Sequence, residues 1–165
     1  AHDSAGKTEV MLRRLFQRTE LIKLDQKDEL NQLLAEFTTE ELLDIKSTPW
    51  GYCIPRRRAL DKSACAENGE PQQHLASPEY CFGCQNFLME QAHVPLSLIA
   101  IAKDVEALKC EQLPFHFKQS SVKAVRELIA RLKQLDCNNK ALLNEKYIED
   151  LQGALDITKL QKEVA

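Results

Sequence analysis

The chain has 165 residues, of which 44% are hydrophobic and 28% are charged, and its formal net charge is −3 at pH 7. This length fits one domain, and the composition is ordinary for a soluble globular protein. The mild negative charge excludes a protein that holds nucleic acid by bulk charge alone, although it leaves room for a local basic surface. No apolar run reaches transmembrane length and no signal peptide opens the chain, so we expect a cytoplasmic protein without a membrane partner.

Residues 1–48 are predicted to form an N-terminal helical segment. Apolar residues recur near helical spacing from Val10 to Phe37. Thr38, followed three residues later by Glu41, has the pattern of a capping box, which predicts that a short helix begins there. Pro49 is expected to end that helix, because the residue before a proline disfavours helical backbone angles.

Residues 49–86 have a different character. Seven proline and glycine residues interrupt this stretch, and no apolar periodicity runs through it. A long stretch without regular structure is unusual inside a compact domain, so something other than a hydrophobic core is needed to order it. Four of the six cysteines lie here, and a metal ion bound by them would supply that order: Cys53, Cys65, Cys81 and Cys84.

Residues 87–165 are predicted to form a C-terminal helical segment. Helix is expected to resume at Phe87–Met89, and Pro95 suits the first turn of the next helix, which Pro114 is expected to end. Apolar residues between Val122 and Leu135 repeat at intervals of three and four, which predicts an amphipathic helix. The other expected boundaries are a cap at Ser120 or Ser121, a stop at Asn138–Asn139 and a last amphipathic helix from Lys140.

The fold class predicted from these patterns is all-α, a helical bundle with an irregular zinc-binding loop of four cysteine ligands inserted between helices. The segments 1–48, 49–86 and 87–165 are expected to form one domain. The chain begins at Ala1 without an initiator methionine, so we expect it to be a fragment of a longer protein.

The motif Cys81-Phe82-Gly83-Cys84 is the strongest chemical signal in the chain. Two thiolates separated by two residues can bind one zinc ion, and Gly83 permits the tight turn that this requires. A redox-active cysteine pair shares the spacing, but it needs a βαβ context that this sequence does not predict. Cys53 and Cys65 supply two further ligands, with 11 residues between them and 15 between Cys65 and Cys81.

Tetrahedral coordination by Cys53, Cys65, Cys81 and Cys84 would give a closed site, and a closed Zn²⁺ site is structural because it has no open position for water. Other readings of the six cysteines stay open. His74 is an alternative ligand that would replace one cysteine, and the cysteines could instead form disulfides or stand as unconnected thiols. Cys110 and Cys137 fall in predicted helices, where we expect small buried thiols.

Two basic sets are candidates for contact with nucleic acid. Three adjacent arginines on a rigid loop could clamp phosphates, and the alternative is a solvated loop that offsets thiolate charge. These loop residues are Arg56, Arg57, Arg58 and Lys62.

Residues 25–44 are acid-rich, whereas the region around the helix after Ser121 is basic, which predicts one acidic and one basic face. The basic residues there are Lys118, Lys123, Arg126, Arg131 and Lys133.

The cysteines and their flanking residues resemble a segment of a known family. Thr48–Cys53, then Cys65, then Cys81–Leu88 are similar to the cysteine-rich segment that follows the catalytic domain in some tyrosine recombinases (phage-integrase family) of mobile elements. In that segment, a turn ending in cysteine and an intermediate cysteine precede a Cys-x-x-Cys motif that runs into an apolar helix. The resemblance covers about 40 of the 165 residues.

The resemblance implies that the chain is a non-catalytic, zinc-stabilised accessory domain of a site-specific DNA recombinase or integrase, contributing DNA or protomer contacts. The family's catalysis uses arginines, a histidine and a tyrosine nucleophile, and those motifs would lie before Ala1. Tyr52, Tyr80 and Tyr147 lack the neighbouring arginines and histidine that phosphoryl transfer requires. We therefore expect no enzyme activity from this chain alone and assign no catalytic residue.

Two other classes of function are compatible with the residues. The chain could be a zinc-stabilised protein–protein interaction module unrelated to recombination, which would bind a protein partner or a second copy of itself through apolar helix faces. It could also be a helical enzyme that uses the cysteines in catalysis. Reactivity of Cys84 in the metal-loaded protein would indicate the enzyme, because a zinc-bound thiolate in a closed site is shielded.

Overall fold

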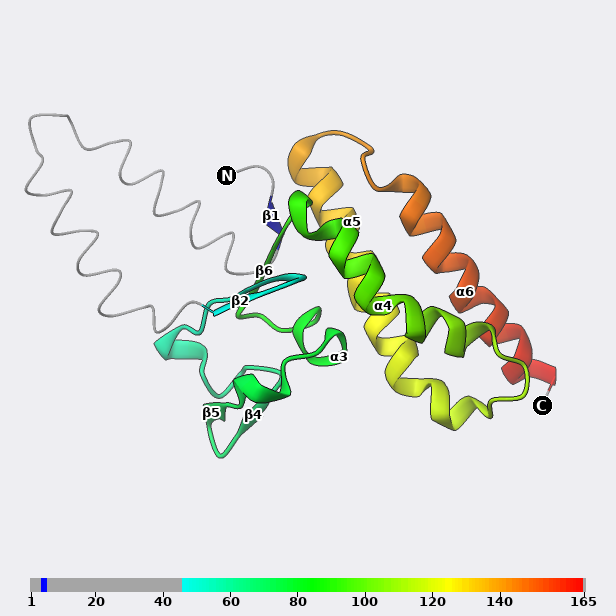
Figure 1. Cartoon of the computed structure of the whole chain (residues 1–165), viewed down its shortest axis with the longest axis horizontal. Coiled ribbons are helices and arrows are strands. Elements are labelled where there is room, and N and C mark those ends of the chain that lie inside the picture. Colours follow the sequence, from blue (N-terminus) through cyan, green and yellow to red (C-terminus); the bar gives the residue numbers. More distant parts are fainter. Residues whose placement is uncertain (1–3, 6–45, 165) are drawn as a thin grey trace, which may run out of the picture.

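The computed structural model describes residues 4–5 and 46–164, which form a small sheet, a cysteine-bearing segment and three long helices (Figure 1). The helices predicted before residue 46, including the one with the capping box at Thr38, lie outside the described residues. No described helix combines the length and the apolar character that crossing a membrane would require.

The larger sheet is antiparallel and has the strand order β1-β6-β3-β2. Its strands are β1 (Ser4–Ala5), β2 (Lys46–Thr48), β3 (Gly51–Cys53) and β6 (Phe87–Glu90). Strands β2 and β3 form a tight hairpin, and the register pairs Cys53 of β3 with Phe87 of β6. This pairing brings the first cysteine of the chain close to the segment that follows the last cysteine of the Cys-x-x-Cys motif.

The prediction that helix resumes at Phe87–Met89 is wrong, because these residues form strand β6. All three side chains are buried, with exposed fractions of at most 5%. A short, fully apolar run does not distinguish a strand from a buried helix by its periodicity. Here the backbone pairs with β1 and β3 on its two edges. The described part is therefore mostly helical but not all-α.

The segment predicted to be irregular contains several short elements. Strands β4 (Ala66–Glu67) and β5 (Glu70–Pro71) form a second hairpin, and Asn68 and Gly69 between them have φ angles of 53° and 82°. Asn-Gly favours this turn because both central residues need positive φ. The remaining elements are the 3-10 helices η1 (Arg57–Ala59) and η2 (Gln73–Leu75) and the short helix α3 (Pro78–Cys81).

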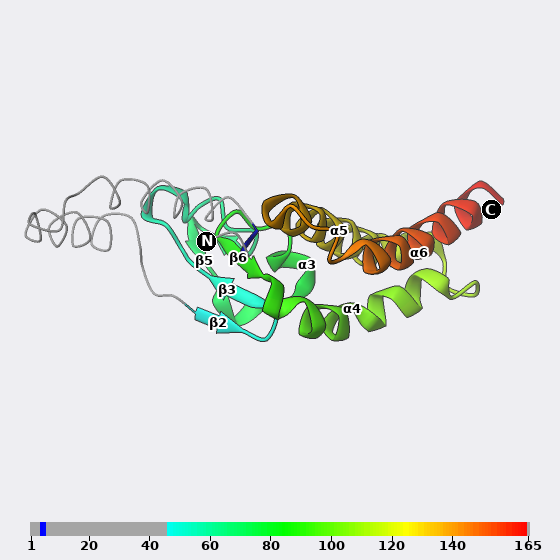
Figure 2. The ribbon, with the colours of Figure 1, turned by 90° about the horizontal axis from the view of Figure 1, so that it is seen from above.

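Helices α4 (Val94–Lys109), α5 (Gln119–Asn139) and α6 (Glu145–Val164) lie side by side as a three-helix bundle (Figures 1 and 2). The 3-10 helix η3 (Gln91–His93) leads into α4, and η4 (Phe115–Lys118) leads into α5. The buried apolar side chains form one core that also includes the residues around the Cys-x-x-Cys motif. From the bundle it contains Ile101, Leu108, Val125, Leu128, Leu132, Leu135, Leu151 and Leu155.

Several predicted helix boundaries are confirmed and others are wrong. Pro95 lies in the first turn of α4, and α5 ends at Asn139, followed by Lys140 in a left-handed conformation. The predicted serine cap of α5 is wrong, because the helix already begins at Gln119 and the Ser121 hydroxyl donates to Asp104 Oδ1 at 2.8 Å. Helix α4 ends at Lys109, before the loop that contains Pro114, and α6 begins at Glu145 and not at Lys140.

Candidate metal centre

The four cysteines of the predicted site lie at the ends of four short segments. Cys53 is the last residue of β3, Cys65 directly precedes β4, Cys81 is the last residue of α3, and Cys84 lies in the turn that follows. Cys84 is buried, and the other three are half-buried. All six cysteines of the chain, including Cys110 and Cys137, are free thiols in this structure, and none is joined in a disulfide.

Hydrogen bonds tie the cysteine-bearing segments to one another. The backbone N–H of Ala64, next to Cys65, donates to Cys84 Sγ at 3.5 Å, and Gln73 Nε2 reaches Cys53 Sγ at 3.9 Å. The backbone N–H of Cys84 donates to the Cys81 carbonyl at 3.0 Å, which closes the turn of the Cys-x-x-Cys motif. The fold thus gathers residues that are 31 positions apart in the sequence into one neighbourhood.

The thiols influence one another electrostatically. Burial raises the pKa of Cys53 to about 11, and the charges of Cys84, Cys81 and Cys65 contribute to this rise. The pKa of Cys81 is raised by burial first and also by Cys84 and Cys65. Charges act this way only over short distances, so the four thiols face a common region. Neighbouring thiolates repel each other, and a divalent cation between them would remove that repulsion.

The thiols do not form a closed ligand shell. Among the described residues, no group of three or more His, Cys, Asp or Glu side chains meets the geometry needed to hold a metal ion. Thiols that share a neighbourhood can raise one another's pKa without lying at metal-ligand distances. The structure therefore brings the predicted ligands together without placing them at ligand distances.

Trp50 adds a polar atom that suits an anionic sulfur. Its indole Nε1 is buried and has no hydrogen-bond partner of ordinary geometry within the described part of the chain. The same group lies near enough to Cys81 to lower the pKa of that thiol, against the larger effect of burial. A buried donor without an acceptor is costly, and a metal-bound thiolate at Cys81 would provide the acceptor. The donor set therefore fits a thiolate-bound cation.

Asn86 connects the segment between the first two cysteines to the Cys-x-x-Cys turn through hydrogen bonds. Its side chain is fully buried, and Nδ2 donates to the Ala59 carbonyl and to Ser63 Oγ, both at 2.8 Å. Arg56 Nε donates to Asn86 Oδ1 at 3.2 Å, and the Ile54 N–H donates to the Asn86 carbonyl at 2.7 Å. One amide side chain therefore organises the loop through directional bonds.

Arg131 of α5 braces the same turn from the side of the helical bundle. Its guanidinium is buried, and it donates to the carbonyls of Phe82 and Cys84 at 2.6 Å each and to that of Phe87 at 3.1 Å. Burial lowers the pKa of Arg131 to about 10, and Cys84 is the strongest of the anionic groups that oppose this shift. A buried cation directed at carbonyls next to thiols is suited to an anionic metal–thiolate cluster.

Gly83 lies close to helix α5. A Cβ atom at this position would lie 2.8 Å from the carboxyl carbon of Glu127, one helical turn before Arg131. Glu127 and Arg131 thus flank the turn from the same side of α5. The Glu127 carboxyl atoms end a flexible side chain that can shift, and the φ angle of Gly83 is not positive, so neither space nor backbone conformation demands glycine here.

The loop residues predicted to bind nucleic acid are divided among different environments. Arg56 is half-buried and bonded to Asn86, whereas Arg57 in η1 and Lys62 are exposed; Arg58 also lies in η1. The same segment exposes acidic side chains at Asp61, Glu67 and Glu70. The surface of this segment is therefore of mixed charge, and Arg56 has a structural partner.

Other sequence candidates take positions away from the four thiols. His74 is exposed in η2, and its neighbour Gln73, not His74, contacts Cys53. His93 caps η3, where its Nδ1 accepts from the backbone N–H of Glu90 at 3.0 Å. The expectation of a buried thiol is wrong for Cys137, which is exposed on α5.

Sequence reasoning missed the supporting residues Asn86, Glu127 and Arg131. For Arg131 a signal exists, because it lies among Leu128, Leu132 and Leu135 on the apolar stripe of its helix. A lone cation on an apolar face must find buried acceptors. The polar Asn86, directly before three apolar residues, is a weaker signal of the same kind.

Comparison with protein-family models, with curated proteins and with solved structures gave no significant match for this chain. The fold and the candidate site are therefore interpreted from the chain's own residues.

Proposed function

We propose that Cys53, Cys65, Cys81 and Cys84 bind one structural zinc ion and that the chain is a zinc-stabilised binding domain without catalytic activity of its own. The observation behind this proposal is the convergence of four cysteine-bearing segments on one region, fastened by Asn86 and Arg131. Four thiolates are the donor set typical of structural zinc, and the ion would stabilise the segment that carries them.

We further propose that the chain is an accessory domain of a site-specific DNA recombinase and contributes DNA or protomer contacts. The resemblance of residues 48–88 to the cysteine-rich segment of tyrosine recombinases supports this role. The order of the cysteines and the run from Cys84 into an apolar segment are the features they share. The apolar segment is a strand here and not the helix of that pattern.

Titration with Co²⁺ tests the metal site. We expect one Co²⁺ per chain to produce the intense near-ultraviolet charge-transfer absorption of cobalt bound by thiolates, and Zn²⁺ to displace it. The variant Cys84→Ser should lose most of this absorption, whereas Cys137→Ser should retain it. Equal spectra for the two variants would overturn the assignment of the ligands.

Binding to duplex DNA tests the role. The zinc-loaded chain is expected to bind duplex DNA at low salt, with an affinity that falls as the salt concentration rises. Absence of binding at low salt, combined with self-association in solution, would favour the interaction module instead. Exposed apolar side chains favour this second candidate, since Leu96 and Ile99 on α4 are 47% and 70% exposed.

A further inference from the structure

The outer face of α5 has a single sign of charge. Every exposed residue of this helix is basic or uncharged, and the exposed bases are Lys123, Arg126 and Lys133, continued by Lys140 just after the helix. We call these four residues the α5 basic face. No ion pair joins them to another described residue, so their charges are available to a partner.

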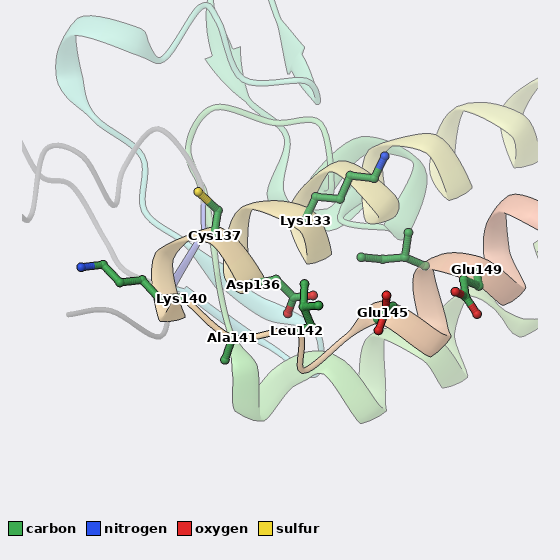
Figure 3. A pocket seen from close by; sticks show the side chains of 9 residues that line it. Lys133, Asp136, Cys137, Lys140, Ala141, Leu142, Glu145 and Glu149 are labelled. Atoms are coloured by element: carbon green, nitrogen blue, oxygen red, sulfur yellow. The ribbon is translucent and has the colours of Figure 1, made fainter.

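Both acidic residues of α5 lie next to other segments of the fold. The Glu127 carboxylate lies against Gly83 of the Cys-x-x-Cys turn. Asp136 is buried and accepts from Asn144, whose backbone N–H and Nδ2 lie 3.1 Å and 2.8 Å from Asp136 Oδ1. In Figure 3, Asp136 points toward the loop before α6, whereas Lys133, Cys137 and Lys140 project from other sides of the helix. The fold thus removes Asp136 from this surface, whereas Glu127 is half-buried.

The structure also corrects the basic face expected from the sequence. Lys118 is buried, and its Nζ donates to the carbonyls of Leu108 and Cys110 at 3.2 Å and 2.6 Å, so it closes the end of α4. Arg131 is buried against the Cys-x-x-Cys turn. Neither residue is available to a partner, and the solvent-facing set is Lys123, Arg126, Lys133 and Lys140.

The other two helices of the bundle provide a contrast. The exposed surface of α6 mixes lysines with acidic residues at Glu145, Glu149, Asp150 and Asp156. On α4, Glu106 lies between the exposed Lys103 and Lys109 along the chain. A mixed surface is typical of a solvated face, so the uniform sign on α5 is a feature of that helix within the described bundle.

We infer that the α5 basic face binds the phosphate backbone of a nucleic acid. At 1.5 Å per residue, Lys123 and Lys140 are about 25 Å apart along the axis, which suits an extended, regularly charged polymer. Arg126 also lines a depression of about 370 Å³ together with Lys159, Lys162 and Glu163 of α6, so the charge of this depression is mixed with an excess of bases. This inference relies on the proposed function for the choice of DNA, and it moves the contact from the arginine loop to α5.

An acidic protein is the less suitable partner. Protein interfaces rely on buried aromatic or large apolar anchors, and the exposed residues of α5 include none, since Ala130 and Cys137 are their only nonpolar side chains. Contacts to phosphates need no such anchor, because released counterions supply the driving force.

A second pocket of about 690 Å³ near Lys133 and Lys140 is also lined by Glu145 and Glu149, so its charge is mixed (Figure 3).

Fluorescence anisotropy with a labelled DNA duplex, measured over a series of salt concentrations, tests the inference on the full zinc-loaded chain. The α5 variant Lys123→Gln/Arg126→Gln/Lys133→Gln is compared with a control, Lys103→Gln/Lys109→Gln/Lys146→Gln, which removes the same charge from exposed positions of α4 and α6. We expect the α5 variant to bind at least about tenfold more weakly at about 0.1 M salt, and its salt slope to fall by about 3. The control variant should bind like the unmodified chain.

Four outcomes would contradict the inference in distinguishable ways. If the unmodified chain binds DNA and the α5 variant binds equally well, the α5 surface is wrong while the proposed DNA role stands. Loss of binding in Arg57→Gln/Lys62→Gln alone would place the contact on the arginine loop. If the unmodified chain does not bind at low salt, both the surface and the DNA role fail. Binding to polyglutamate as tight as to DNA would favour an acidic protein partner. Thermal unfolding of each variant shows whether the fold is intact.

Discussion

The cysteine-bearing segment and the three-helix bundle are ordered by different means. In the bundle, leucines such as Leu128, Leu132 and Leu135 are fully buried against neighbouring helices, so burial of apolar area holds the helices together. Residues 54–86 contribute Phe82 and Cys84 to the same core, and directional bonds to Asn86 and Arg131 hold this segment in addition. The two regions should therefore respond to different perturbations. The bundle should be most sensitive to cavities in its apolar core, and the cysteine-bearing segment to the loss of hydrogen-bond donors or of a metal ion.

Removal of the metal is expected to have the largest effect and to separate the two regions most sharply. Structural zinc contributes on the order of 10 kcal/mol of folding free energy in small peptide systems, so its loss should strongly destabilise residues 50–86. We expect a chelator to abolish hydrogen-exchange protection in this segment first, while α4, α5 and α6 stay partly protected. Equal protection with and without the chelator would contradict the comparison.

Loss of the brace from α5 should come next. The substitution Arg131→Met keeps much of the buried volume but leaves the carbonyls of Phe82, Cys84 and Phe87 without this donor. We expect a loss of about 3 kcal/mol in the free energy of unfolding, because buried unsatisfied acceptors are costly.

A matched control is Arg126→Met on the exposed side of the same helix, which should change stability by less than about 0.5 kcal/mol. Arg131→Lys should be less harmful than Arg131→Met but still destabilising, because an ammonium lacks the planar fork of a guanidinium. Equal effects of the two methionine substitutions in urea unfolding would show that Arg131 does not brace the turn.

A glycine in β3 tests the packing between the sheet and the residue after the Cys-x-x-Cys motif. A Cβ atom at Gly51 would lie 2.4 Å from Phe87 Cζ and 2.6 Å from the Leu88 carbonyl oxygen. Gly51→Ala should therefore destabilise the fold by about 2 to 3 kcal/mol through overpacking. At Gly69 no atom lies within 4 Å, so Gly69→Ala should cost only about 1 kcal/mol from its positive φ angle. Thermal unfolding in which Gly69→Ala is the more harmful change would refute this reading.

The smallest expected effect has the opposite sign. Gly153 is exposed within α6, and a Cβ atom there would meet no atom within 4 Å. Gly153→Ala should stabilise the bundle by about 0.5 to 1 kcal/mol, because alanine loses less backbone freedom than glycine in a helix. The midpoint of chemical unfolding should rise, and an unchanged or lower midpoint would mean that α6 does not continue through this position.

Local patterns predicted much of the bundle and much less of the cysteine region. Pro95 marked the start of α4 and Asn138–Asn139 the end of α5, because backbone restrictions act within a few residues. Strand β6 was not predictable, since its identity depends on partners far away in the chain. The Asn68-Gly69 dipeptide, by contrast, is a local turn signal, and it joins β4 to β5 in the structure.

The candidate site shows the same division. The four cysteines were chosen from the sequence as ligands, because thiols in this pattern have a chemical meaning without a fold. The supporting residues Asn86, Glu127 and Arg131 gain their meaning only from contacts between distant segments, such as that of Arg131 with the Phe82 carbonyl. The mixed environment of Arg56 was likewise hidden, because nothing in the sequence pairs it with Asn86.

The metal content of the purified chain tests the central claim most directly. Elemental analysis of protein purified without added metal, together with a count of reactive thiols, should give one zinc ion per chain, and Cys84→Ser should lose it. Protein that lacks stoichiometric zinc, or in which these cysteines are oxidised in pairs, would contradict the account.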